Sequence, residues 1–213
     1  MLHIKSFTFN PYQENTYLIY DDEKNCAVID PGMHNYQEEE FLSDYIRRNE
    51  LNVVALINTH GHIDHVLGNK YICETYSVMP NFHEKELPLI IQVQNYAPQM
   101  GIRYEPSPIP DSFLSENDTI KIGNYELSLI LAPGHSPGHL CIYNEEHQFL
   151  IGGDVLFYRS IGRTDLPGGN HQQLLSSIAT KIYTLPDHTI VYPGHGQPTT
   201  IGEEKANNPF IRA

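Results

Sequence analysis

The beginning of the chain alternates short apolar runs with turn-forming residues, and this pattern predicts β-strands. Turn-rich pieces such as Asn10-Pro11 and Asp21-Asp22 separate the runs. The runs expected to form strands are residues 2–9, 16–20 and 26–30. Because they follow one another closely, we expect them to form a meander.

A helix and a buried strand are predicted next. Residues 36–50 carry apolar side chains at helical spacing, from Phe41 to Ile46, among charged residues. This is the pattern of a surface helix packed on a core. The continuous apolar run that follows predicts a buried strand over residues 53–58.

The rest of the chain repeats this mixture of helices and strands. Residues 66–76 can form a helix, because the carboxylate of Asp64 is favoured near its N-terminus. Further elements are expected as strands at residues 119–122, 126–131, 140–143, 149–151 and 189–192, and as an amphipathic helix at residues 171–184. Two sets of strands with helices between and after them predict an α/β layered sandwich, in a single domain over residues 1–213.

Residues 84–111 interrupt this regular pattern. Residues 84–100 have helical character, but Pro88 and Pro98 predict an irregular helix that breaks at the prolines. The prolines within residues 104–111 predict an extended loop. We expect this insertion near the active site, where it can form the wall of a pocket.

The composition narrows the classes of protein to which the chain can belong. It has 213 residues, and 26 acidic against 13 basic residues give a formal net charge of -13. Such a chain repels polyanions, so nucleic acid is not an expected partner. No apolar run approaches the roughly 20 residues of a membrane span, and the N-terminus lacks the pattern of a secretory signal. Cys26, Cys73 and Cys141 lack CxxC spacing and are predicted to be buried, reduced thiols, which favours the cytoplasm.

A dense set of metal-ligand side chains follows the predicted buried strand. Residues 59–65, Thr-His-Gly-His-Ile-Asp-His, hold three imidazoles and one carboxylate. Side chains two apart in an extended segment point the same way, so His60 and His62 can converge on one ion. Asp64 and His65 begin the next element and offer further ligands. The alternative is a polar loop that is merely rich in histidine, and the convergent spacing favours the metal site.

Three more candidate ligands each lie in a turn rich in Gly or Pro after a predicted strand. They are His135 in APGHSPGH, Asp154 in IGGDVLF and His195 in YPGHGQP. A glycine beside a ligand allows the backbone and the ion to approach closely, and a strand end holds the ligand on a rigid scaffold. The full set of candidates is His60, His62, Asp64, His65, His135, Asp154 and His195.

This set, in this order, resembles the metallo-β-lactamase superfamily. The resemblance extends from VIDPG at residues 28–32 to YPGHG at residues 192–196. Within the superfamily, GRTDLPGG at residues 162–169 and NPFIR at residues 208–212 are similar to the short glyoxalase II-like hydrolases, and GRTD also resembles a stretch of the persulfide dioxygenases. The resemblance implies an αββα four-layer sandwich of two mixed β-sheets with helices on the outer faces.

The resemblance also implies two metal sites that share one carboxylate. The implied ligands are His60, His62 and His135 for the first ion, Asp64, His65 and His195 for the second, and Asp154 for both. Imidazole and carboxylate ligands without thiolate suit zinc, and also iron or manganese. Two ions about 3.5–4 Å apart can share a hydroxide that forms at neutral pH. The implied reaction is hydrolysis of a small-molecule thioester such as S-lactoylglutathione, with Asp64 and Asp154 as catalytic residues.

Candidates for the surroundings of the ligands follow from what an imidazole needs. A ligand imidazole usually donates its other N–H to a carboxylate or a carbonyl, which points to Asp30 and Thr59. The alternative for Asp30 is that it forms the turn before Pro31. For Thr59 the preferred interpretation is a hydroxyl that bonds the backbone at a strand end. His139 is predicted to be buried and hydrogen-bonded rather than an eighth ligand.

The basic residues nearest the predicted metal turn are candidates for binding an anionic thiol carrier. Full-length glyoxalase II enzymes, which the chain resembles, continue into a helical domain that supplies basic residues for the glutathione carboxylates. Here only a short segment follows His195. Tyr158, Arg159 and Arg163 are therefore the candidate substrate-binding residues. The alternatives are that Arg163 pairs with Asp165 and that Tyr158 only packs.

Other functions stay open at this level. A persulfide dioxygenase would use one iron in the first site, and the presence of the second-site ligands favours the hydrolase. A secreted β-lactamase would be expected to carry a signal sequence, a nuclease to have a basic face, and a flavin-linked diiron reductase to have Glu at the position of His62. A non-enzymatic module stabilised by metal is disfavoured, because structural zinc sites are closed and often rich in thiolate.

Overall fold

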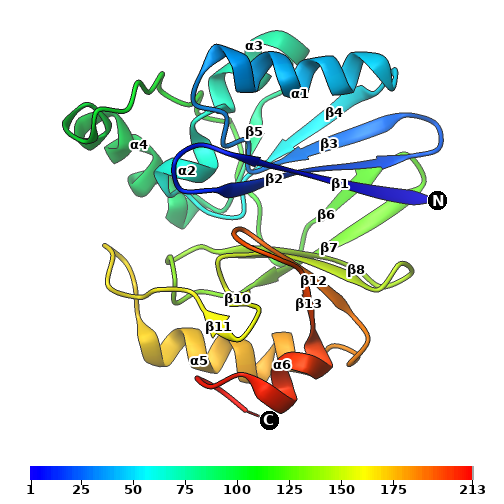
Figure 1. The fold of residues 1–213 in the computed structure, drawn as a ribbon, viewed down its shortest axis with the longest axis vertical. Coiled ribbons are helices and arrows are strands. Elements are labelled where there is room, and N and C mark those ends of the chain that lie inside the picture. The colour runs from blue at the N-terminus through cyan, green and yellow to red at the C-terminus, as the bar shows by residue number, and fades with distance from the viewer. Residues whose placement is uncertain (213) are drawn as a thin grey trace.

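Two β-sheets lie face to face at the centre of the molecule, with helices on their outer sides (Figure 1). The computed structural model describes residues 1–212. In Figure 1, α1 (Tyr36–Arg48) and α3 (Asn69–Tyr76) cover the upper sheet, and α5 (His171–Thr180) and α6 (Ile201–Asn207) cover the lower one. The layers run helix, sheet, sheet, helix, which confirms the predicted αββα sandwich.

The upper sheet is built from the N-terminal part of the chain, in the order β1-β2-β3-β4-β5. Its strands are β1 (Leu2–Phe9), β2 (Glu14–Asp21), β3 (Asn25–Ile29), β4 (Asn52–Ile57) and β5 (Pro80–Asn81). The first three strands form the expected antiparallel meander. β4 lies parallel to β3 and to β5, because helices connect these strands.

The lower sheet has the order β13-β12-β9-β8-β7-β6. Its strands are β6 (Thr119–Ile122), β7 (Tyr125–Leu131), β8 (Leu140–Asn144), β9 (Phe149–Gly153), β12 (Ile190–Pro193) and β13 (Thr199–Thr200). β6 to β9 are antiparallel neighbours, whereas β12 returns parallel to β9 after α5. The carboxyl ends of β9 and β12 and the beginning of β8 therefore lie at one edge of the sheet.

The remaining elements are short, and along the chain they connect the main strands of the two sheets. They are α2 (Ile63–Val66), η1 (Glu84–Glu86), α4 (Leu87–Tyr96), η2 (Ala97–Met100), the hairpin β10 (Leu156–Phe157) with β11 (Ser160–Ile161), and η3 (Ile182–Thr184). α4 projects to the left of the upper sheet in Figure 1, on the same side as α2.

The apolar core is divided into layers by the two sheets. Side chains alternate along a strand, so the apolar run of β3 serves two layers. Ala27 and Ile29 pack between the sheets, whereas Cys26 and Val28 pack with side chains of α1 and α3. A third layer joins the lower sheet to α5 and α6. Strands that are buried on both faces explain why the sequence shows continuous apolar runs.

The positions at which the helices break differ from those predicted from the sequence. The helix expected over residues 66–76 is divided into α2 and α3, with Gly68 packed too closely against Pro31 and Met33 for any side chain. Pro88 does not break a helix but lies at its first turn, where its missing N–H costs nothing. The sequence analysis did not predict β5, β10, β11, β13 or α6.

The cysteines are buried in the structure, as predicted. Cys26, Cys73 and Cys141 are buried and unpaired. No helix within residues 1–212 is long and apolar enough to cross a membrane.

We predict that shortening a side chain between the sheets destabilises the fold strongly. Ile142 is fully buried there, and Ile142→Ala should lower the free energy of unfolding by about 2–5 kcal/mol, because it removes apolar contacts and leaves a cavity. The matched control is Ile190→Ala on β12, whose side chain is 40% exposed and whose loss should cost much less. Urea unfolding of both variants measures this, and equal losses would contradict it.

Candidate metal centre

Four loops at strand ends bring the predicted ligands to one edge of the two sheets. Residues 60–65 follow β4 of the upper sheet. His135 lies between β7 and β8, Asp154 follows β9 and His195 follows β12, all in the lower sheet. Because these strand ends meet at the same edge, side chains far apart in the sequence become neighbours.

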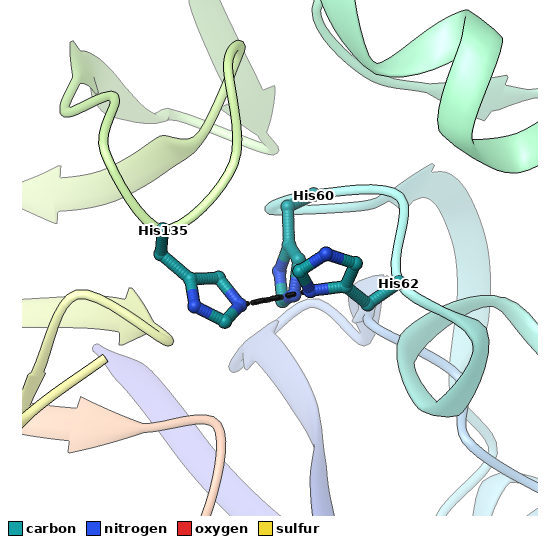
Figure 2. Close-up of side chains that lie close together, drawn as sticks. All are labelled: His60, His62 and His135. Atoms are coloured by element: carbon teal, nitrogen blue, oxygen red, sulfur yellow. Dashed lines mark hydrogen bonds between the residues drawn. The ribbon is translucent and has the colours of Figure 1, made fainter. Parts of the chain in front are cut away.

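The first cluster consists of three imidazoles, and Figure 2 shows them converging from two loops. His135 Nε2 lies 2.8 Å from His62 Nδ1 and 3.2 Å from His60 Nε2. The three rings are roughly perpendicular to one another, so their nitrogens point at a common position. Such a triangle of nitrogens is the arrangement that a divalent ion requires from three histidines.

The second cluster consists of a carboxylate and two imidazoles. Asp64 Oδ2 lies 3.1 Å from His195 Nε2 and 3.7 Å from His65 Nε2. Ligand atoms of the three residues lie within 4.8 Å of one another. This cluster therefore also fits a metal ion bound by nitrogen and oxygen.

Asp154 lies between the two clusters. Its Oδ1 is 3.5 Å from His65 Nε2, and its Oδ2 is 3.5 Å from His135 Nε2 and 3.6 Å from His195 Nε2. One carboxylate thus faces ligands of both clusters, which is the position of a bridging ligand. The structure brings together all seven residues that the sequence proposed as ligands.

The hydrogen bonds around the first cluster leave two nitrogens facing each other without a proton. Thr59 Oγ1 donates to Asp30 Oδ2 at 2.6 Å, so it can only accept from His60 Nδ1, 3.0 Å away. His135 Nδ1 donates to the carbonyl of Arg163 at 2.7 Å. In neutral rings the Nε2 atoms of His60 and His135 are then both unprotonated. Two lone pairs directed at each other repel, and a cation between them removes the repulsion.

Buried polar atoms without partners support the same conclusion. Within residues 1–212, His65 Nε2, Asp154 Oδ1 and His62 Nε2 are buried and have no hydrogen-bond partner. Unpaired buried polar atoms are costly and rare. The first two face each other at the second cluster, so the residues present fit a metal ion there.

Burial favours the uncharged form of the first cluster. It lowers the pKa of His62 to about 3 and of His135 to about 4, and lowers that of His60 well below its usual value. Neutral imidazoles are the form that binds metal. In the second cluster burial also opposes charge, but the carboxylates of Asp64 and Asp154 outweigh it and raise the pKa of His65.

Asp30 connects ligands of both clusters. Its carboxylate accepts the Thr59 N–H at 2.7 Å and the Thr59 hydroxyl, and His65 Nδ1 lies 3.1 Å from Oδ2. Thr59 in turn accepts from His60. Both residues hold ligand imidazoles. For Thr59 this corrects the interpretation preferred from the sequence, because its hydroxyl bonds the side chains of Asp30 and His60 rather than the backbone. Asp30 holds its partners from a turn with a φ of 48°, a conformation that Asp and Asn tolerate well.

His139 is a buried neighbour of the centre. Its Nε2 accepts the backbone N–H of Asp154 at 3.0 Å, and its ring stacks on that of His60. The imidazole thus fixes the backbone beside the bridging carboxylate, in the hydrogen-bonded role expected for it.

A cavity of about 810 Å³ opens onto the two clusters. Five of the seven candidate ligands, including both candidate catalytic carboxylates, and part of the insertion contribute to its lining. The lining residues from the insertion are Leu89, Gln92, Tyr96 and Met100. α4 and η2 therefore form one wall of the cavity beside the metal centre.

The three candidate substrate-binding residues lie in different places. Arg163 lines the cavity, but its guanidinium donates to the carboxylate of Asp165, from Nε to Oδ1 at 2.7 Å and from Nη2 to Oδ2 at 2.8 Å. Tyr158 and Arg159 do not line the cavity. Arg159 pairs with Glu203 of α6 at 2.6 Å and lies over the Tyr158 ring. The geometry thus gives no support to a substrate role for Tyr158 and Arg159, because α6, which the sequence analysis did not predict, holds the arginine.

Two buried carboxylates at the centre were not expected from the sequence. Glu14 of β2 lies 3.9 Å from His65 Nδ1, and Glu86 joins the loops of the first cluster. Glu86 of η1 is fully buried and bonds the backbone of the two loops that carry the first cluster, at Gly61 and Gly138. It stands among exposed charged residues in the sequence, so nothing in the local pattern distinguishes it.

Comparisons with known proteins agree with this geometry. The metallo-beta-lactamase superfamily matches residues 9–195. Hydroxyacylglutathione hydrolase GloC of Haemophilus influenzae is 37% identical over 214 residues, which cover 100% of this chain and 99% of that protein.

Two solved structures share the whole fold. The BLEG-1 B3 metallo-beta-lactamase superposes with a TM-score of 0.89 at 37% identity, over 99% of this chain and 100% of the other. TTHA1623, solved in a di-iron-bound form, superposes with a TM-score of 0.87 at 34% identity, over 97% of this chain and 100% of the other. The chain belongs to the metallo-beta-lactamase superfamily, as one of its metallo-hydrolases.

Proposed function

We propose that the protein hydrolyses thioesters in a reaction of the glyoxalase II type, with two metal ions in the centre. The observation that carries the proposal is the position of Asp154, whose two oxygens face the ligands of both clusters. The identity of 37% with a hydroxyacylglutathione hydrolase over the full chain supports the reaction type.

Each cluster supplies three ligands and shares the fourth. The first ion would be held by His60, His62 and His135, the second by Asp64, His65 and His195, and both by Asp154. Two such ions would supply an ionised water at neutral pH and polarise the thioester carbonyl. The absence of thiolate ligands suits zinc, iron or manganese, and we propose zinc. The di-iron form of TTHA1623 makes iron the alternative.

The residues of the chain itself orient the reactants. Asp64 and Asp154 both line the cavity, so their carboxylate oxygens can accept hydrogen bonds from a water molecule beside the carbonyl carbon. Asp30 and Thr59 keep His60 and His65 in the required tautomer and orientation. A thiolate leaves with little need for an acid, so the proposed reaction requires no proton donor for the leaving group.

The net charge and the buried cysteines indicate the partner molecule and the cellular location that we propose. We propose a small-molecule thioester as the partner, with no role for nucleic acid, because a net charge of -13 repels polyanions. We propose the cytoplasm as the location, supported by three buried, unpaired thiols.

A second candidate function is the hydrolysis of β-lactams. The observation that favours it is the match to the BLEG-1 B3 metallo-beta-lactamase, which is as similar in sequence as the thioester hydrolase. The same centre can attack an amide carbonyl, but an amine leaves less easily than a thiolate. Assays with a thioester and with a β-lactam distinguish the two candidate functions.

We predict that the protein, purified without added metal, contains about two metal ions per chain and hydrolyses S-lactoylglutathione faster than a β-lactam. His62→Ala should lower the metal content and reduce thioester turnover at least about 100-fold, because it removes a ligand of one ion. The matched control is His188→Ala, which removes an exposed imidazole at the opposite end of β12.

Elemental analysis and side-by-side assays measure these outcomes. Unchanged turnover in His62→Ala would contradict the proposed centre. Consumption of oxygen with glutathione persulfide, together with a single iron, would replace the hydrolase by a persulfide dioxygenase.

We further predict that Asp30→Asn weakens metal binding about 10- to 100-fold. Asn keeps the size of the side chain and tolerates the positive φ at this position, so the backbone stays in place. Its single oxygen cannot replace both carboxylate oxygens, so its NH₂ group must face either the Thr59 N–H at the Oδ1 position or the Thr59 hydroxyl and His65 Nδ1 at the Oδ2 position. Competition with a chelator measures the affinity. Asp187→Asn, which changes an exposed carboxylate paired with Lys205, is the control and should bind metal as the unmodified protein does.

A further inference from the structure

The walls of the cavity differ in chemistry from what a small polar acyl group requires. The insertion contributes Leu89, Gln92, Tyr96 and Met100 to the lining, and Gln92 is the one amide among them. Further apolar side chains of the lining come from the segment after Asp154. These residues are Phe157, Ile161, Leu166 and Pro167.

Charge near the cavity is confined to the metal centre and one arginine. Within residues 1–212, the lining contains no lysine, and its single guanidinium, that of Arg163, is bound by Asp165. The two carboxylates of a glutathione carrier would therefore find no free cation in the cavity. A volume of about 810 Å³ is also much larger than a lactoyl group needs.

We propose, on the basis of the thioester hydrolase function above, that the cavity takes an apolar acyl group and that the thiol carrier extends into solvent. Apolar walls gain free energy by removing apolar surface of the substrate from water, and a charged carrier avoids them. The substrate class is thus a thioester whose acyl part is a hydrocarbon chain or an aromatic ring, rather than a short hydroxyacyl group.

A series of acyl groups on one thiol tests this proposal. With glutathione held constant, kcat/KM should rise at least about tenfold from S-lactoyl- to S-hexanoylglutathione, since each methylene in an apolar pocket contributes a factor of this order. Equal values for the two substrates would overturn the inference and leave the proposed function intact. No hydrolysis of any thioester would overturn the proposed function itself.

Variants of α4 locate the acyl group. Leu89→Asn should lower the ratio of kcat/KM for the hexanoyl to that for the lactoyl substrate by about tenfold. The matched control is Ile91→Asn on the same helix, whose side chain is 42% exposed and does not line the cavity, so this ratio should not change. Equal ratios in both variants would overturn the placement of the acyl group on α4. Should Leu89→Asn fail to fold, Met100→Ser, an exposed lining residue, takes its place.

A different observation concerns Glu86, which joins the insertion to the metal centre. Its carboxylate is fully buried, with Oε2 accepting the Gly61 N–H at 2.8 Å and Oε1 the Gly138 N–H at 2.5 Å. Gly61 separates His60 from His62, and Gly138 lies in the loop of His135. One side chain thus bonds the loops from the upper and the lower sheet that together form the first cluster.

The two glycines allow this close approach. A Cβ on Gly61 would lie 2.8 Å from Ile90 Cγ1 and 3.0 Å from the Glu86 carbonyl oxygen. A Cβ on Gly138 would lie 2.9 Å from His83 Nδ1 and 3.1 Å from Glu86 Oε1. The insertion therefore packs directly on both ligand loops, and a side chain at either position would push it away.

We infer that Glu86 is a positioning residue that sets the separation between His135 and the pair His60 and His62. A buried carboxylate that accepts two backbone N–H groups fixes both loops at once, because either loop can move only by leaving a buried donor unpaired. The spacing of three imidazole nitrogens decides how tightly an ion is held.

Metal affinity of Glu86→Gln, measured by chelator competition with Co²⁺, tests this inference. Gln keeps the shape but turns an NH₂ group toward one of the two backbone N–H donors. We expect a loss of affinity of about 10- to 100-fold and a changed visible absorption spectrum of the bound Co²⁺. The matched control is Glu204→Gln in α6, which alters an equally buried carboxylate that accepts the Arg159 N–H and the Asn208 amide.

A general loss of stability would affect both variants, whereas loss of positioning would affect only the first. Equal affinities and spectra in Glu86→Gln and the unmodified protein would overturn the inference, as would an equal loss in Glu204→Gln. Should Glu86→Gln fail to fold, Gly138→Ala keeps the carboxylate and displaces it, and unchanged Co²⁺ affinity there would overturn the inference as well.

Discussion

The repulsion between unprotonated imidazole nitrogens is the constraint on which the rest of this structure depends. The Nε2 atoms of His60 and His135 lie 3.2 Å apart, and hydrogen bonds on the far side of each ring leave both without a proton. Burial keeps the rings neutral, so no added proton relieves the contact. A cation between them would convert this repulsion into coordination.

The two-sheet architecture supplies the rigidity that such a centre needs. The ligands come from both sheets, and apolar layers on either face of each sheet hold the strands that carry them. Loops of β4 and β9 reach the same edge, so a bound ion connects the two halves of the sandwich. Within the upper sheet, Asp30 after β3 holds His65 and, through Thr59, His60, and so fixes the ligands that follow β4.

The insertion contacts both the ligand loops and the cavity. η1 contributes Glu86, which bonds both loops of the first cluster, and α4 follows directly with side chains that line the cavity. A single segment therefore borders the metal ligands on one side and the reacting molecule on the other. The wall of the cavity and the bonds that hold the ligand loops thus belong to one continuous stretch of the chain.

The sequence by itself determined the strands of both sheets except the short β5 and β13, and it determined the seven candidate ligands. Strands can be predicted because alternation and apolar runs are local features of the sequence. The ligands can be predicted because the imidazoles at residues 60–65 are costly to bury without a metal. Only the tertiary structure decided the role of Glu86, the place of Arg159 beside α6, and the chemistry of the cavity walls. Glu86 bonds glycines that are 25 and 52 residues away. No local pattern encodes such contacts, because they arise only when the two sheets pack and bring distant loops to one edge.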